Sequence, residues 1–158
     1  MVGRARRAWV LVAGVAALTL VGAACSSDDE GGGGGDAGGT TVAVTLQEFA
    51  VGATPASAPA GSITFEATNN GPEDVHEIVV IKTDLAPDAL PTNADGSVNE
   101  VGEGIEPIDE IEDIPVGETQ DLTVDLEAGN YVLICNIYEE AEQESHYQEG
   151  MRTAFTVE

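Results

Sequence analysis

The stretch that decides the fold is GNYVLICNIYEEAEQESHYQEGMRTAFTVE, which spans residues 129–158. It opens with residues 131–135, which are apolar at every position, as expected of a strand in the middle of a sheet. It closes with Phe155 and Val157 at alternate positions, which indicates a last strand with one buried face. The stretch also carries three side chains that can bind a soft metal ion: Cys135, His146 and Met151.

The same kind of pattern recurs upstream of this stretch. Apolar and polar residues alternate over residues 41–47, 63–68 and 121–126, and residues 78–82 are apolar on both faces. Turn-forming combinations of Pro, Gly and Asn separate these runs, at residues 59–61, 69–72, 115–117 and 127–129. A period of two interrupted by turns predicts an all-β domain, most simply an antiparallel β-sandwich.

Residues 83–118 depart from this pattern. They contain 11 acidic residues and no Lys or Arg, and their apolar residues are mostly scattered. We therefore expect an acidic insertion at about 83–118, either as a long loop or as an insertion with a short helix around residues 87–90.

The N-terminal segment has the features of an export signal. Three arginines precede an apolar run that ends in small residues before Cys25. The polar, glycine-rich residues after Cys25 resemble the start of a bacterial lipoprotein, in which this cysteine carries lipid. We thus expect a signal peptide at 1–24, a lipid-anchored flexible tether at 25–40 and a folded domain at 41–158. The alternative is an ordinary cleaved signal that leaves an unused cysteine.

The charge of the chain limits its partners. Removal of the signal leaves Lys82 and Arg152 against 29 acidic residues, a formal charge of −27. Such a charge argues against binding to nucleic acid and against direct docking on an anionic membrane. A partner protein with a basic docking face and simple solubility in a salty medium both remain as explanations of the acidity.

The metal-binding side chains of the mature chain form a small set. If Cys25 carries lipid, Cys135 is the only free thiol, and it has no disulfide partner in an exported protein. Any one of these residues alone would most simply be structural. Two imidazoles, one thiolate and one thioether together form the ligand set of a blue-copper site, here His76, His146, Cys135 and Met151. Zinc remains an alternative, although it favours a fourth strong ligand.

Three segments resemble the cupredoxins, the family of plastocyanin and azurin. GNYVLICN at 129–136 and SHYQEGMRTAFTVE at 145–158 are similar to the C-terminal ligand hairpin of that family, and NNGPEDVHEIVVIK at 69–82 is similar to its earlier ligand strand. The resemblance implies an antiparallel Greek-key β-sandwich over about 41–158 with one type 1 copper ion. Two features depart from the family: Glu77 stands where many members have Asn, and the ten residues between Cys135 and His146 form a longer loop.

The resemblance also implies a role for each ligand. The Cys135 thiolate forms the short bond to copper, His76 and His146 complete a trigonal plane, and Met151 is a weak axial ligand. The edge of His146 on an exposed loop is the expected electron port.

The function implied is that of an electron carrier and not of an enzyme. We expect the carrier to be a monomer on the extracytoplasmic side of a bacterial membrane, attached only through Cys25, with a redox partner that the sequence does not identify. Two alternatives stay open, namely a copper-binding or copper-buffering lipoprotein without redox turnover, and a metal-free cell-surface interaction domain. A multicopper oxidase is disfavoured because the chain has only two histidines.

Overall fold

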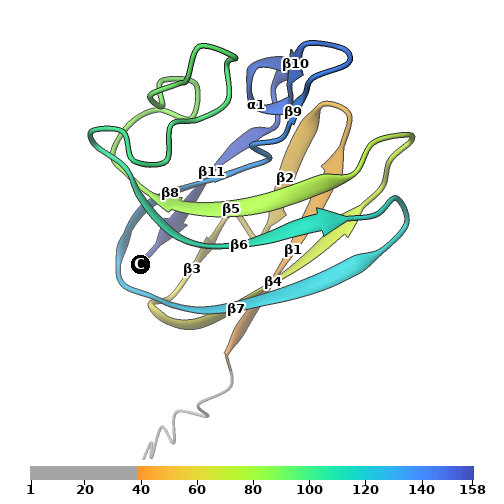
Figure 1. The fold of residues 1–158 in the computed structure, drawn as a ribbon. Coiled ribbons are helices and arrows are strands. Elements are labelled where there is room, and N and C mark those ends of the chain that lie inside the picture. The colour runs from red at the N-terminus through yellow and green to blue at the C-terminus, as the bar shows by residue number, and fades with distance from the viewer. Residues whose placement is uncertain (1–38) are drawn as a thin grey trace, which may run out of the picture. The chain divides into compact units, whose positions relative to one another are not determined.

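The computed structural model describes residues 39–158 of the chain (Figure 1). The expected signal peptide, Cys25 and nearly all of the expected tether lie outside the described residues. Within residues 39–158, no helix is both long enough and apolar enough to cross a membrane.

Two β-sheets pack face to face in this domain (Figure 1). One sheet has four strands in the order β2-β1-β4-β7, and the other has five in the order β3-β11-β8-β5-β6. Strands β9 and β10 form a separate two-stranded ribbon. In chain order the elements described over residues 39–158 are β1 (Thr40–Gln47), β2 (Ala50–Thr54), β3 (Ser57–Ala58), β4 (Gly61–Asn69), β5 (His76–Lys82), β6 (Glu106–Ile114), β7 (Thr119–Leu126), β8 (Gly129–Ile134), β9 (Tyr138–Glu139), β10 (Glu144–Ser145), α1 (His146–Glu149) and β11 (Arg152–Val157).

The predicted all-β sandwich is confirmed, and the alternating residues face the core as expected. Val42, Val44 and Leu46 of β1 are buried, and the residues between them are exposed. Most neighbouring strands are antiparallel, but β1 runs parallel to β4 and β3 runs parallel to β11. Alternation reports which side chains are buried and carries no information on strand direction, so these two parallel pairs could not be predicted from it.

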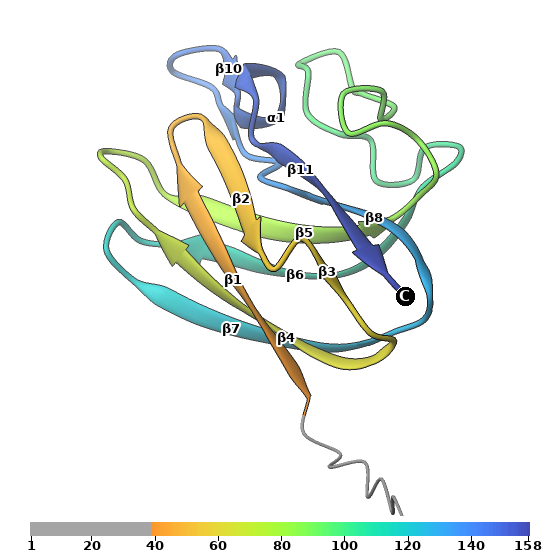
Figure 2. The same cartoon turned by 180° about the vertical axis from the view of Figure 1, so that it is seen from behind.

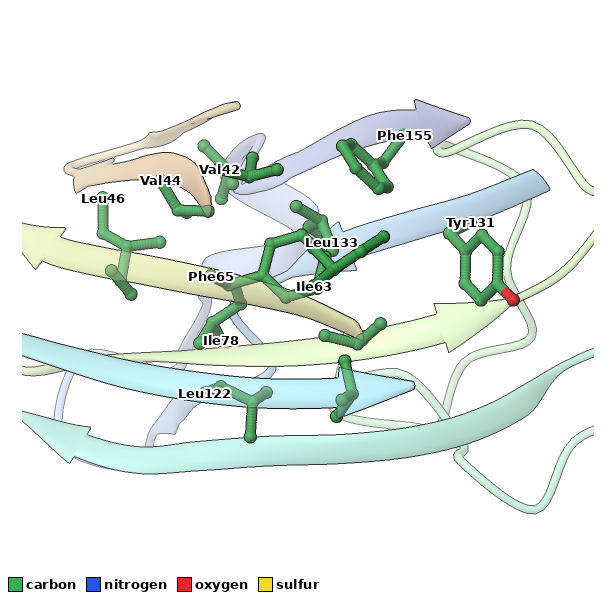
Figure 3. Close-up of a cluster of buried hydrophobic side chains, with 14 of the residues drawn as sticks. Val42, Val44, Leu46, Ile63, Phe65, Ile78, Leu122, Tyr131, Leu133 and Phe155 are labelled. Atoms are coloured by element: carbon green, nitrogen blue, oxygen red, sulfur yellow. The ribbon is translucent and has the colours of Figure 1, made fainter. Parts of the chain in front are cut away.

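The core between the two sheets is built from aliphatic side chains around three aromatic rings, those of Phe65, Tyr131 and Phe155 (Figure 3). The rings of Phe65 and Phe155 meet edge to face, with centroids 5.3 Å apart. Such a pair contributes about 0.5–1.5 kcal/mol beyond the area that it buries. Cys135 and Met151 belong to the same buried cluster, so two of the four expected ligands are held by the packed interior.

The expected acidic insertion at 83–118 is shorter than predicted, because its second half is a strand of the sheet. Residues 106–114 form β6, which pairs with β5 along the edge of the five-stranded sheet. The pairing contains two register shifts, and the apolar residues of β6 recur every third residue, at Ile108, Ile111 and Ile114. The shifts interrupt the period of two by which strands are recognised in sequence. Of the two alternatives for this segment, the one with a short helix at 87–90 is wrong, since only a turn occurs there.

Residues 83–105 cover the outer face of the five-stranded sheet. Leu90 and Val98 of this connection are buried against a second hydrophobic cluster, which consists of Val79, Ile81, Val132, Ile134 and Tyr147. The hydroxyl group of Tyr147 donates a hydrogen bond to Pro87 O at 2.8 Å and accepts one from Leu90 N at 3.1 Å. This cover explains why the central strands β5 and β8 are apolar on both faces.

Candidate metal centre

Three of the four predicted ligands lie where strands of the five-stranded sheet begin or end, and the fourth, His146, follows the β10 strand of the separate ribbon. His76 is the first residue of β5, and Cys135 directly follows β8. His146 is the first residue of α1, and Met151 directly precedes β11. All four residues have a relative exposure of 0%. Figure 2 shows that β10 and α1 lie at the same end of the sandwich as the turn between β1 and β2.

Three of the predicted ligands converge on one point. The Cys135 Sγ lies 3.3 Å from His146 Nδ1 and 3.9 Å from His76 Nδ1, and the two Nδ1 atoms are 3.3 Å apart. An ion at the centre of three donors, with bonds of about 2.0–2.3 Å, separates them by about 3.5–4 Å. The three donors therefore fit a single metal ion, and one thiolate with two imidazoles suits copper.

Met151 is joined to the other ligands through the backbone. Its N–H group donates to His146 O at 2.9 Å, and its carbonyl oxygen accepts from Cys135 N at 3.0 Å. Its side chain is buried in the same core cluster as Cys135. The short segment from α1 to β11 thus holds the thioether residue beside the other three.

The environment of Cys135 keeps the thiol protonated in the absence of a cation. Burial raises the pKa of the Cys135 thiol to about 12, and carboxylates at Glu77 and Glu139 also raise it. The Glu77 N–H group donates to the sulfur at 3.5 Å, which favours the thiolate. A bound metal cation reverses this balance, because it deprotonates a coordinating thiol.

Glu77 braces the cysteine segment even though it replaces the usual Asn. Its Oε1 accepts a hydrogen bond from the backbone N–H of Asn136, at 2.8 Å. Burial raises the pKa of Glu77 to about 7, and nearby carboxylates at Glu110 and Glu100 act in the same direction.

Asn136 in turn fastens the cysteine segment to the connection 83–105. Its Oδ1 accepts from Val98 N at 2.5 Å, and its Nδ2 donates to Val98 O at 3.1 Å and to Glu100 Oε1 at 2.8 Å. Glu77 and Asn136 therefore tie the segment after Cys135 both to β5 and to the connection 83–105.

The turn before His76 is held by a buried asparagine. Asn69 accepts from Gly71 N at 2.8 Å, and its Nδ2 donates to Asp74 O at 2.8 Å and Ile114 O at 2.9 Å. Gly71 has a positive φ of 63°, which favours glycine in this position of the turn. These bonds fix the path of the chain two residues before His76.

Glu48 lies against the outer nitrogen of His76. Its Oε1 is 3.7 Å from His76 Nε2 and accepts hydrogen bonds from Glu73 N at 3.0 Å and Asp74 N at 2.5 Å. Burial raises the pKa of Glu48, but these backbone hydrogen bonds outweigh it, and the net pKa is lowered. Burial and the neighbouring His146 lower the pKa of His76.

The prediction that the edge of His146 is exposed is wrong. The residue is completely buried. Its backbone N–H group donates to Ile137 O at 3.0 Å, and the centroid of its ring lies 5.3 Å from that of Phe49.

The ten residues between Cys135 and His146 are long enough to form the β9–β10 ribbon, which pairs Glu139 with Glu144.

Sequence reasoning missed the carboxylates on the outer side of the site. Asp74 and Glu144 each place an oxygen within 4.8 Å of a ring nitrogen of His146. In a chain with 29 acidic residues spread along its length, no sequence signal distinguishes these two, or Glu48, from the others.

Comparison with known proteins identifies the fold. No protein-family model matches the chain, and no curated protein matches its sequence. Among solved structures, the auracyanin of Roseiflexus castenholzii is 23% identical with a TM-score of 0.54, over 75% of this chain and 97% of its own. The azurin of Methylomonas sp. strain J is 18% identical with a TM-score of 0.50, over 75% of this chain and 98% of the azurin chain. Rusticyanin from Thiobacillus ferrooxidans is 15% identical with a TM-score of 0.51, over 76% of this chain and 79% of the rusticyanin chain. The described domain has the cupredoxin fold, and its donor set matches one copper ion.

Proposed function

We propose that this chain is a lipid-anchored type 1 copper protein that carries single electrons on the extracytoplasmic side of a bacterial membrane. The observation that carries the proposal is the convergence of Cys135 Sγ and the two histidine Nδ1 atoms at 3.3–3.9 Å, in three residues that are fully buried. A similar solved structure, auracyanin A from Chloroflexus aurantiacus, is described as a "blue" copper protein.

The chain supplies a rigid frame for such a site. A bound copper ion provides the one-electron couple between Cu(II) and Cu(I). His76 is held by β5 and by the Asn69 turn, and Cys135 is held by β8 and Glu77. Because these donors are fixed by strands and backbone hydrogen bonds, the site changes shape little when the charge of the ion changes. A site of this kind transfers electrons and transforms no substrate.

Metal analysis and voltammetry of the copper-loaded domain test the proposal. We expect about one copper per chain, strong visible absorption from thiolate charge transfer and a reversible one-electron wave. Copper uptake without a reversible wave would favour copper buffering instead. A domain that takes up no copper would favour a metal-free interaction domain.

The lipid anchor is a separate part of the proposal. It is supported by the signal-like residues before Cys25 and by the polar, glycine-rich residues after it. We expect the mature protein to fractionate with membranes, and Cys25→Ser to release it or to leave the precursor unprocessed. A Cys25→Ser protein that is processed and fractionates like wild type contradicts the anchor.

The redox partner is proposed to present a basic face. Support comes from the acidic residues around the outer side of the site, namely Glu48, Glu73, Asp74, Glu139, Glu142 and Glu144. Association with a cationic acceptor should slow steeply as ionic strength rises. A rate that does not depend on salt would leave the acidity as a feature of solubility alone.

A further inference from the structure

An open pocket of about 450 Å³ lies on the outer side of the metal centre. It is lined almost wholly by acidic side chains, namely Glu48, Glu73, Asp74, Glu139, Glu142 and Glu144, together with Phe49 and Pro72. Part of this lining lies close to His146, which is one of the ligands of the centre.

Two carboxylates of the pocket form a compact group with His146. One oxygen of Asp74, one oxygen of Glu144 and one ring nitrogen of His146 all lie within 4.8 Å of one another. The Nδ1 atom of this ring faces Cys135 and His76, so the nitrogen left for the carboxylates is Nε2.

The Nε2 atom of His146 is buried and has no hydrogen-bond partner in residues 39–158. Glu48 Oε2 and His76 Nε2 are unpaired in the same way, but these two residues lie against each other, with Glu48 Oε1 3.7 Å from His76 Nε2. A buried polar atom without a partner costs about 1–3 kcal/mol, and such atoms commonly mark the place of an ion or a water molecule. An unpaired, buried ring nitrogen of His146 beside the carboxylates of Asp74 and Glu144 is the arrangement expected of a cation site.

We propose that Asp74, Glu144 and the Nε2 atom of His146 form a second cation site, which takes a divalent transition-metal ion such as Zn²⁺. Carboxylate oxygens and imidazole nitrogens are both zinc ligands, and a site with three protein ligands takes water as the fourth. His146 is then shared between the two sites, with Nδ1 facing inward and Nε2 facing outward.

The geometry requires only a small adjustment. Tetrahedral zinc with bonds of about 2.1 Å separates its ligands by about 3.4 Å, and the three donor atoms lie within 4.8 Å of one another, so they must close in by up to about 1.4 Å. The side chains of Asp74 and Glu144 are only partly buried, and Glu144 lies on the short β10 strand, so both can rotate.

The proton balance differs with the state of the inner site. In the copper-free protein a neutral His146 with its proton on Nδ1 offers Nε2 directly to the cation. When Nδ1 holds an inner ion, binding at Nε2 releases the Nε2 proton to solvent. The outer site can therefore form in both states, with the loss of one proton when the inner site is filled.

Equilibrium dialysis of the copper-free protein against Zn²⁺ tests the proposal. We expect two bound equivalents in the wild type, one at each site, and one bound equivalent in the double variant Asp74→Asn, Glu144→Gln. Loss of ligands should weaken the outer site at least about 10-fold, since even partners outside the first coordination shell are worth 10–100-fold. Circular dichroism establishes that the double variant is folded.

Glu142→Gln is the matched control. It removes one negative charge from the same pocket but leaves the three donors in place, so it should change outer-site affinity less than about twofold, because exposed charges are screened. Equal zinc binding by wild type and the double variant would overturn the outer site, as would an equal loss in Glu142→Gln.

Copper-loaded protein separates this inference from the proposed function. In that state the wild type should bind one Zn²⁺, and the double variant should bind none. If copper fails to load but the zinc equivalent that depends on Asp74 and Glu144 persists, the proposed function fails and the outer site stands. If copper loads and the copper-loaded wild-type protein binds no zinc, the proposed function stands and the outer site fails.

Discussion

The two imidazoles of the metal centre have very different surroundings on their inner and outer sides. On the inner side, Nδ1 of His76 and Nδ1 of His146 face the Cys135 sulfur, in a pocket continuous with the hydrophobic core. On the outer side, the same rings lie beside the carboxylates of Glu48, Asp74 and Glu144. One histidine pair thus separates a soft, uncharged region from a strongly acidic one.

This difference assigns different tasks to the two sides. Soft donors in a buried pocket decide whether a copper ion binds and what colour it has. Carboxylates outside the ligands change how strongly the imidazoles donate and how the oxidised and reduced states compare in free energy. Inner substitutions should therefore abolish the metal site, and outer substitutions should only change its reduction potential.

The largest effect is expected at the inner thiol. Cys135→Ser should abolish the thiolate charge-transfer absorption completely, because a hydroxyl group cannot supply that transition. Glu48→Gln, on the outer side, should retain most of the absorption per bound copper. Visible spectra of the two copper-loaded variants make the comparison, and full colour in Cys135→Ser would show that the ligand assignment is wrong.

The next effect concerns Glu77, beside the inner site, in the copper-free domain. The pKa of Glu77 rises from 4.5 to about 7 on folding, so the folded state binds more protons than the unfolded state between these values. The contribution of this group to the free energy of unfolding is complete below about pH 4.5. As pH rises to about 7, this free energy falls by about 2–3 kcal/mol. Urea unfolding of wild type and Glu77→Gln at pH 5 and pH 7.5 measures it.

Glu77→Gln keeps an oxygen that can accept from Asn136 N but cannot ionise, so the drop in stability should disappear in this variant. The exposed Glu127→Gln is the control and should keep the wild-type pH dependence. An unchanged pH dependence in Glu77→Gln would mean that another group is responsible.

Substitution of Met151 should shift the reduction potential while copper stays bound. Leu leaves no axial donor and should raise the potential, whereas Gln supplies an oxygen that favours Cu(II) and should lower it, each by on the order of 100 mV. Leu is close to Met in volume, so a packing role alone predicts equal potentials and a small loss of stability. Protein-film voltammetry of the three proteins decides between these outcomes.

The smallest effect is expected from the outer carboxylate of Glu48. Its oxygen lies 3.7 Å from His76 Nε2, so its charge stabilises the more positive Cu(II) state. Glu48→Gln should raise the reduction potential by about 50 mV, which is close to a tenfold change in the equilibrium. Glu142→Gln, in the same pocket, should change it much less. Equal shifts in the two variants would indicate a general field effect.

Much of the fold and the inner site could be predicted because the signals are local. Alternation over 41–47 and 63–68 correctly predicted buried faces, and the turn at 69–72 lies where expected. The inner donors were predictable for a simpler reason, since the chain contains few soft or imidazole side chains. Three of them, His76, Cys135 and His146, meet in the structure, and Met151 joins them through the backbone.

Strand β6 shows where local signals fail. Its pairing with β5 contains two register shifts, so its isoleucines recur every third residue and its acidic residues face solvent. The partner strand β5 lies more than twenty residues earlier in the chain. The spacing of the isoleucines in β6 is explained only by the register shifts in its pairing with β5. The same holds for residues 83–105, whose Leu90 and Val98 are recognisable as buried only once the sheet beneath them is known.

By itself, the sequence determined the β-sandwich class, the soft donor set and the strongly acidic character. The alternation of apolar and polar residues depends only on neighbouring residues, and composition and net charge are sums over the chain. Only the tertiary structure decided that His146 is buried and that Glu48, Asp74 and Glu144 are the acids that surround the site. These residues come from the turn after β1, the turn before β5 and strand β10. They meet only because the two sheets and the β9–β10 ribbon bring distant segments to one end of the domain, and each contact depends on that packing.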